Sequence, residues 1–252
     1  MRAEAVGARR FGRAGARSLH TAEEERSQLL AEIRDDIGVV CPKYHELTQT
    51  LRQFVARYLA AEEPTGLLLG VVSAGTGEGR TTVALGLAGA LADMCANVAL
   101  VELAGEAEQA TLATELGLPA GAGLTGYLHH GMSLEDVVQP TAKSNLWLLP
   151  AGQTDRPNRL AANSATGALL ARLRERYAVT VIDVPALLAN EDAPALVGQL
   201  DGAVLVVGAG HTRDYEVAEV VSLLGEVPVR GILLNQVRKW APGWVASLLQ
   251  PA

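Results

Sequence analysis

A glycine-rich run between an apolar stretch and a helical pattern is the first place where this chain could do chemistry. The segment 73–82 reads SAGTGEGRTT and follows the apolar run LLLGVV at 67–72. Glycines in such a turn let consecutive backbone N–H groups surround phosphate oxygens, and the positive end of the following helix adds to the attraction. The pattern predicts a phosphate-binding loop made of Gly75, Thr76, Gly77, Glu78, Gly79, Arg80, Thr81 and Thr82.

This loop departs from the strict G-x-x-x-x-G-K-[ST] pattern at two positions. Ala74 stands at the first glycine, and Arg80 stands where the pattern has lysine. Arginine keeps the positive charge, but its planar fork does not replace the compact lysine ammonium at a tight site. An ordinary glycine-rich turn is the alternative. The order of strand, loop, helix and Thr81 favours phosphate binding.

The elements that must position the loop alternate along the chain from residue 67 onward. Apolar runs without alternation are typical of strands buried on both faces of a parallel sheet. Such strands are expected at 67–72, 97–103, 146–150, 178–183, 202–208 and 229–235. Helices are expected between them, at 81–94, 165–177, 192–200 and 214–224. The alternation predicts a doubly wound α/β fold with a mostly parallel sheet.

The flanks differ from this core, and the sequence predicts four regions. Residues 1–36 are expected to be a disordered, charged tail. An amphipathic helix in 37–66 leads into the domain, since Leu51, Phe54 and Val55 share one face of a helix. The phosphate-binding domain is expected at 67–237, followed by a tail at 238–252. Arginines in the first region leave an electrostatic arm for anionic lipid open as an alternative to a plain tail.

Composition excludes several classes of protein. The net charge is −7, which argues against a nucleic-acid surface and its basic patch. Aromatic residues make up only 4%, so alanine, valine and leucine must build the core. Cys41 and Cys95 are expected to be reduced thiols. No apolar segment reaches the roughly 18 residues of a membrane span, and the N-terminus lacks a secretory apolar region, so a cytoplasmic location is expected.

Several segments in order make residues 43–237 similar to bacterial tyrosine kinases, the cytoplasmic P-loop domains paired with capsular polysaccharide chain-length regulators. The loop SAGTGEGRTT resembles that family's S-x-x-P-G-E-G-K-[ST]-[ST]. The family resemblance continues through GLTGYLHHGMSLEDVVQPT at 123–141, NLWLLPAG at 145–152 and AVTVIDVPALLANEDA at 178–193. MinD/ParA ATPases, which share the deviant Walker class, place a signature lysine where this chain has Gly75, and this disfavours them.

The resemblance implies a nucleotide, a metal and roles for the acidic residues. ATP would bind on the loop, with Mg²⁺ held by Thr81 and Asp183. Asp183 and Glu102 would be the catalytic residues, because Glu102 stands at the first aspartate of the family's D-x-D-x-R strand motif. Ala104 and Glu106 replace that motif's second aspartate and its arginine. The structural alternatives are that Asp183 caps a strand-to-loop turn and that Glu102 is a solvated charge at a strand end.

Partners also follow from the resemblance. A membrane polysaccharide chain-length regulator (co-polymerase) or a kinase paralogue is expected, with recruitment to the inner face of the plasma membrane by that partner, and no nucleic acid. A homo-oligomer is expected from the family's E-x-x-R-x-x-R ring motif, of which Glu46 and Arg52 remain and Gln49 replaces the middle arginine.

Three departures together predict a catalytically impaired, regulatory member of this family. Arg80 replaces lysine, Ala104 replaces an aspartate, and no tyrosine follows Asn235, where family kinases carry a tyrosine cluster. Three alternatives stay open at this point. They are an active tyrosine kinase or slow ATPase, a MinD/ParA-like positioning ATPase, and a scaffold that binds no nucleotide.

Overall fold

A seven-stranded sheet organises the protein in the computed structural model, which describes residues 45–58, 65–94, 97–103, 112–119, 121–152 and 163–237. The strand order is β3-β4-β2-β5-β1-β6-β7. All neighbouring strands run parallel except β3 and β4. The strands are β1 (Leu67–Ser73), β2 (Val98–Glu102), β3 (Gln139–Pro140), β4 (Leu146–Leu149), β5 (Val179–Asp183), β6 (Gly202–Gly208) and β7 (Val229–Asn235).

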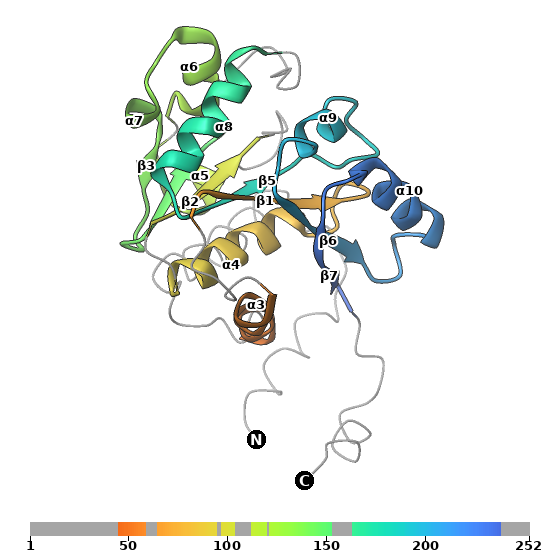
Figure 1. Ribbon diagram of the computed structural model, residues 1–252. Helices are drawn as coiled ribbons and strands as arrows, with labels where there is room; N and C mark the ends of the chain where they lie inside the picture. The colour runs from red at the N-terminus through yellow and green to blue at the C-terminus, as the bar shows by residue number, and fades with distance from the viewer. Residues whose placement is uncertain are drawn as a thin grey trace, which may run out of the picture.

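Helices cover the two faces of the sheet, so the domain has three layers (Figure 1). One face carries α3 (His45–Tyr58), α4 (Arg80–Ala92) and α5 (Leu112–Glu115). The other face carries α6 (Gly123–His130), α7 (Leu134–Val137), α8 (Ala165–Arg176), α9 (Ala193–Val197) and α10 (Asp214–Leu224). The doubly wound α/β fold with a mostly parallel sheet is confirmed.

The core beneath α3 and α4 shows how a chain poor in aromatics packs tightly. Leu51, Phe54 and Val55 of α3 are buried, as their helical spacing predicted. A Cβ at Gly86 of α4 would lie 2.7 Å from Leu51 Cδ1, so the two helices approach closely there. The small residue in α4 therefore lets α3 pack closely against that helix.

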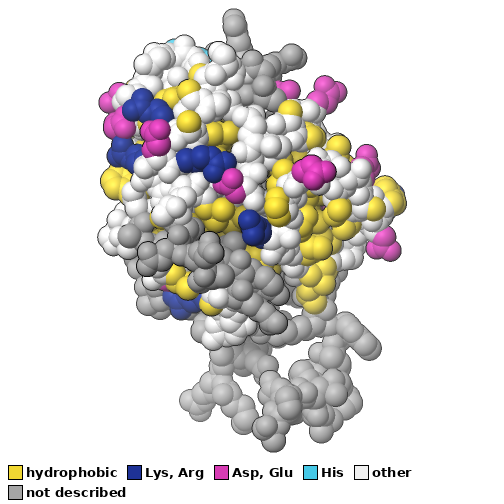
Figure 2. All heavy atoms as spheres, viewed as in Figure 1, with side chains coloured by type: hydrophobic (Ala, Val, Ile, Leu, Met, Phe, Trp, Pro, Cys, Tyr) yellow, Lys and Arg dark blue, Asp and Glu magenta, His cyan; other side chains and the backbone are white. Residues whose placement is uncertain are grey.

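The last strand is less buried than the sequence predicted. The run 229–235 was expected to be covered on both faces, but Ile232 is 57% exposed and Leu234 is 61% exposed. The expectation was wrong because β7 lies at the sheet's edge, and its opposite face packs Gly231 against Phe54. Seen from one side, apolar side chains gather over β7 and α10 (Figure 2).

Other differences are small. The helix expected at 192–200 is shorter, because α9 ends at Val197 and is capped by Gly198, whose N–H donates to the Pro194 carbonyl. The two-residue strand β3 was not predicted, since so short a strand gives no periodic signal. The expected tails at 1–36 and 238–252 lie outside the described residues. Among the described helices, none has the length and apolar character needed to span a membrane.

Candidate functional site

The glycine-rich segment forms the connection between β1 and α4, at the edge where β1, β2 and β5 end. Gly77 and Gly79 have φ angles of 77° and 85°, which favour glycine. Gly79 precedes the first helical residue, and a side chain there would run into Asn235. Thr76, Gly77 and Thr82 are exposed to solvent. The loop thus presents backbone N–H groups and a helix start at an accessible edge.

Glu78 holds the loop from inside. Its side chain is only 7% exposed. Its Oε1 accepts hydrogen bonds from Gly75 N at 3.1 Å and from Thr212 Oγ1 at 2.8 Å. The Thr212 oxygen in turn accepts from Gly208 N. The Glu78 carboxylate therefore fixes the loop to the end of β6, so its predicted part in binding a nucleotide would come through its backbone.

The end of β7 supports the loop as well. Asn235 Nδ2 donates to the Glu78 carbonyl at 2.9 Å, and Gln236 Nε2 donates to the Gly77 carbonyl at 2.7 Å. The sequence did not predict that Gln236 and Thr212 support the loop. These contacts join residues 134 to 159 positions apart, so no local sequence pattern predicts them.

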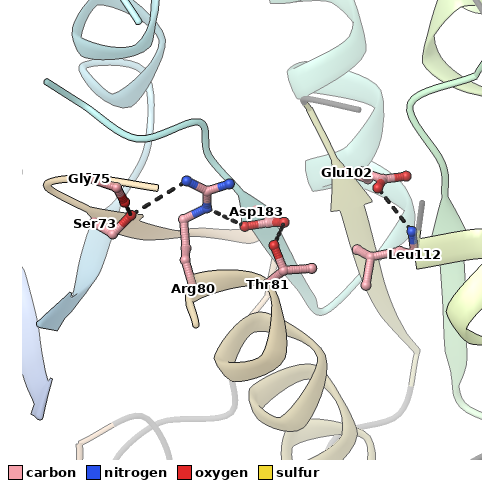
Figure 3. A network of polar contacts seen from close by, with 7 residues as sticks. All are labelled: Ser73, Gly75, Arg80, Thr81, Glu102, Leu112 and Asp183. Carbon is pink, nitrogen blue, oxygen red and sulfur yellow. Dashed lines mark hydrogen bonds and ion pairs between the residues drawn. The ribbon is translucent and has the colours of Figure 1, made fainter. Parts of the chain in front are cut away.

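Arg80, Thr81 and Asp183 form the polar centre of the site (Figure 3). Arg80 Nε donates to Asp183 Oδ1 at 2.7 Å, and Thr81 Oγ1 donates to Asp183 Oδ2 at 2.8 Å. Arg80 Nη1 lies 3.4 Å from Ser73 Oγ. The side chains of Arg80 and Asp183 are 14% and 3% exposed. Both oxygens of a buried carboxylate are thus occupied by donors from the first turn of α4.

Sheet register explains why these residues meet. Asp183 ends β5, which lies between β1 and β2, and its Cα is paired with Val71 and with Glu102. The chain leaves β1 two residues beyond Val71 and enters α4 at Arg80. In a parallel sheet the carboxyl ends of neighbouring strands share one edge, so the first turn of α4 falls beside Asp183.

Glu102 sits next to Asp183 in the sheet, but its carboxylate turns elsewhere (Figure 3). Its Oε1 accepts from Leu112 N at 2.9 Å and its Oε2 from Ala151 N at 3.1 Å. Burial raises the pKa of Glu102 above its ordinary value, the two backbone bonds oppose this, and the nearby negative charges of Asp183 and Glu115 add to it. Glu102 fixes neighbouring segments, and its catalytic role stays a prediction.

The predicted Mg²⁺ ligands do not fit a metal ion in this arrangement. Thr81 and Asp183 offer hard oxygen atoms, the type that Mg²⁺ prefers. One Asp183 oxygen, however, is bonded to the Arg80 guanidinium, and a divalent cation there would face that positive charge. The assignment of Mg²⁺ to Thr81 and Asp183 stays a prediction.

Comparisons with known proteins find relatives and solved structures that are similar in sequence and fold. The chain is 30% identical to the tyrosine-protein kinase YwqD of Bacillus subtilis (strain 168) over 155 residues, which cover 61% of this chain and 65% of YwqD. The crystal structure of the VpsO kinase domain has 30% identity and a TM-score of 0.66, with 87% of this chain and 100% of that chain covered.

A further solved structure is similar in fold. The septum site-determining protein MinD of Pyrococcus horikoshii OT3, complexed with Mg-ADP, has 25% identity and a TM-score of 0.55, with 72% of this chain and 76% of that chain covered. No protein-family model matches the chain. The chain spans slightly less than two thirds of the length of YwqD.

Proposed function

Because the chain belongs to the bacterial tyrosine kinase family, we propose that it binds ATP or ADP on the loop 73–82. The family resemblance and the P-loop class of α/β fold expected from the sequence are both confirmed. One observation carries the proposal: the loop opens α4 at an accessible edge and meets Asp183 through Arg80 and Thr81.

Each predicted loop residue has a proposed task that follows from its position. The exposed backbone around Thr76 and Gly77 would donate N–H groups to phosphate oxygens, and the start of α4 would add its partial positive charge. Arg80 would supply the fixed positive charge. Gly75 and Glu78 would keep the loop open, because the Glu78 carboxylate draws the Gly75 N–H inward.

We further propose that the protein is catalytically impaired and regulatory. Phosphoryl transfer is catalysed mainly by positioning and by charge placed around the transferred group. Arg80, at the position of the catalytic lysine, is held against Asp183. The proposed setting is capsule or exopolysaccharide assembly, through a membrane chain-length regulator or an active kinase paralogue at the inner membrane face.

Calorimetric titration with ATP and with ADP tests nucleotide binding. The proposal expects micromolar dissociation constants, weakened by about tenfold or more in Arg80→Ala. Arg176→Ala is the matched control, because it removes an arginine from an exposed ion pair with Glu135, and it is expected to bind like the wild type. Absence of binding at millimolar nucleotide would contradict the proposal and support a nucleotide-free scaffold.

An active tyrosine kinase or slow ATPase is the second candidate. It is favoured by the intact pair of Thr81 and Asp183, the hydroxyl and carboxylate that the family uses around its nucleotide. Phosphorylation of a tyrosine-containing copolymer by purified wild-type protein, abolished in Asp183→Asn, would establish this candidate and overturn the impairment. A rate unchanged by Asp183→Asn would point to a contaminating kinase.

A further inference from the structure

The ion pair between Arg80 and Asp183 lies where the sequence predicts a metal. We propose that the Arg80 guanidinium takes the place of the divalent cation, so that the protein binds its nucleotide without Mg²⁺. This inference rests on the proposed nucleotide binding and specifies its chemistry. It follows from what the guanidinium contacts, how far water is excluded and which donors remain for a ligand.

Each oxygen of the Asp183 carboxylate already accepts a hydrogen bond from a residue at the start of α4. Oδ1 accepts from Arg80 Nε at 2.7 Å and Oδ2 accepts from the Thr81 hydroxyl at 2.8 Å. Both donors belong to the first turn of α4, so they reach the carboxylate together whenever that helix is formed. A cation that bound Asp183 Oδ1 would have to displace the guanidinium, and one at Oδ2 would lie close to its positive charge.

Shielding from water strengthens this pair. Asp183 is 3% exposed and Arg80 is 14% exposed, so solvent and salt screen their attraction far less than that of a surface pair. A Mg²⁺ ion also gives up its water reluctantly and requires near-octahedral geometry. Replacing the guanidinium would leave Arg80 without its carboxylate partner in a mostly buried position, which is strongly unfavourable.

Arginine can hold the carboxylate and a phosphate at the same time, which lysine cannot do equally well. The guanidinium carries five N–H donors in a rigid plane, and only the Nε–H is spent on Asp183. One terminal nitrogen, Nη1, points toward the start of the loop and lies 3.4 Å from Ser73 Oγ (Figure 3). A planar fork in this place suits the oxygens of a phosphate.

The test compares ADP affinity by calorimetry in excess Mg²⁺ and in excess EDTA. For the wild type we expect dissociation constants that agree within about threefold, because Arg80 supplies the charge in both conditions. For Arg80→Lys, which restores the family's residue, we expect Mg²⁺ to tighten binding by about tenfold or more. A wild-type affinity that falls by about tenfold or more in EDTA would overturn the proposal.

Arg176→Lys is the matched control, since it makes the same chemical change in an exposed ion pair far along the chain from the loop. It should keep the wild-type indifference to Mg²⁺. If Arg176→Lys acquired the same Mg²⁺ dependence as Arg80→Lys, the effect would not belong to the Arg80–Asp183 pair, and the proposal would fail.

A second readout needs no nucleotide. Titration with Mn²⁺, followed by electron paramagnetic resonance, should show a site in Arg80→Ala that disappears in the double variant Arg80→Ala/Asp183→Asn and is absent from the wild type. Mn²⁺ binding by the wild type that is lost in Asp183→Asn would overturn the proposal. If ADP failed to bind in either buffer, the proposed function would fall, and this titration would still decide whether Arg80 excludes the metal.

Discussion

Two carboxylates end neighbouring strands and are equally buried, yet their surroundings differ. Asp183 of β5 and Glu102 of β2 are paired in register, and each is 3% exposed. Asp183 is held by a guanidinium and a hydroxyl from α4, whereas Glu102 is held by two backbone amides. The chemical role of a buried carboxylate therefore depends on the groups that donate hydrogen bonds to it, more than on its burial.

The difference extends to the segments that each carboxylate connects. Asp183 joins the sheet to the loop proposed to bind phosphate. A ligand on that loop would therefore interact electrostatically with the Asp183 carboxylate. Glu102 joins β2 to Leu112 at the start of α5 and to Ala151 after β4, away from that loop. Burial raises the pKa of Glu102, and its two oxygens accept from neutral backbone amides.

Removing the Asp183 carboxylate should produce the largest effect. Asp183→Ala leaves the mostly buried Arg80 without its partner, and we expect the free energy of unfolding to fall by about 3–5 kcal/mol. Urea denaturation measures this change. Glu135→Ala, which removes one side of an exposed ion pair with Arg176, should cost less than about 1 kcal/mol. Equal losses in the free energy of unfolding for the two variants would contradict the expected difference between the buried and the exposed ion pair.

Glu102→Gln should have a smaller effect that depends on pH. Glutamine has one acceptor oxygen for two backbone N–H groups, so we expect a loss of about 1–3 kcal/mol in acid. Since burial raises the folded-state pKa of Glu102, the wild type loses stability relative to Glu102→Gln as pH rises from 4.5 through that raised value.

The deficit of Glu102→Gln should therefore shrink with rising pH, by about 1.4 kcal/mol for each unit of the pKa rise. Urea denaturation of both proteins across the acidic to neutral range measures it. A deficit that grows with pH would mean that Glu102 is held in its charged form, as an acid with a cationic partner would be.

Thr81→Val tests the hydroxyl half of the Asp183 cluster. It removes one charge-assisted hydrogen bond while Arg80 remains, and we expect a loss of about 1.5 kcal/mol. Thr81→Ser keeps the hydroxyl and serves as the control, expected within about 0.5 kcal/mol of the wild type. Thermal or urea unfolding measures both. A Thr81→Val loss as large as that of Asp183→Ala would mean that the guanidinium contributes little.

Glu78 is a third buried carboxylate and belongs with Glu102, since its donors are neutral. Thr212→Val removes one of them, and we expect a loss of about 1 kcal/mol with faster amide exchange at 75–79. Thr212→Ser should restore both properties. Unchanged exchange at 75–79 in Thr212→Val would show that Gly75 and the end of β7 hold the loop without Thr212.

The parts of the fold and of the site that depend on local sequence pattern could be predicted. The bounds predicted for α10 and for β6 and β7 agree with the structure, and the meeting of Thr81 with Asp183 follows from parallel strands ending at one edge. The exposure of Ile232 could not be predicted, because the order of the strands in the sheet decides which strand lies at the edge.

Local sequence pattern also could not predict which side chains far apart in the sequence contact each other. The sequence shows that Arg80 replaces lysine, but the contact of its guanidinium with a carboxylate 103 residues away depends on tertiary geometry. The same holds for Glu102, whose oxygens accept hydrogen bonds from Leu112 N and Ala151 N, 10 and 49 residues away. Side-chain direction within a folded site is set by neighbours that periodicity does not reveal.

Hydrogen–deuterium exchange with and without ADP tests the central claim most directly, namely that this family member binds its nucleotide on the loop 73–82. The account predicts slower exchange in peptides that cover 75–82, lost in Arg80→Ala, with the exposed edge strand β7 before Asn235 unchanged. Slowing elsewhere in the chain while 75–82 exchanges as before would contradict it.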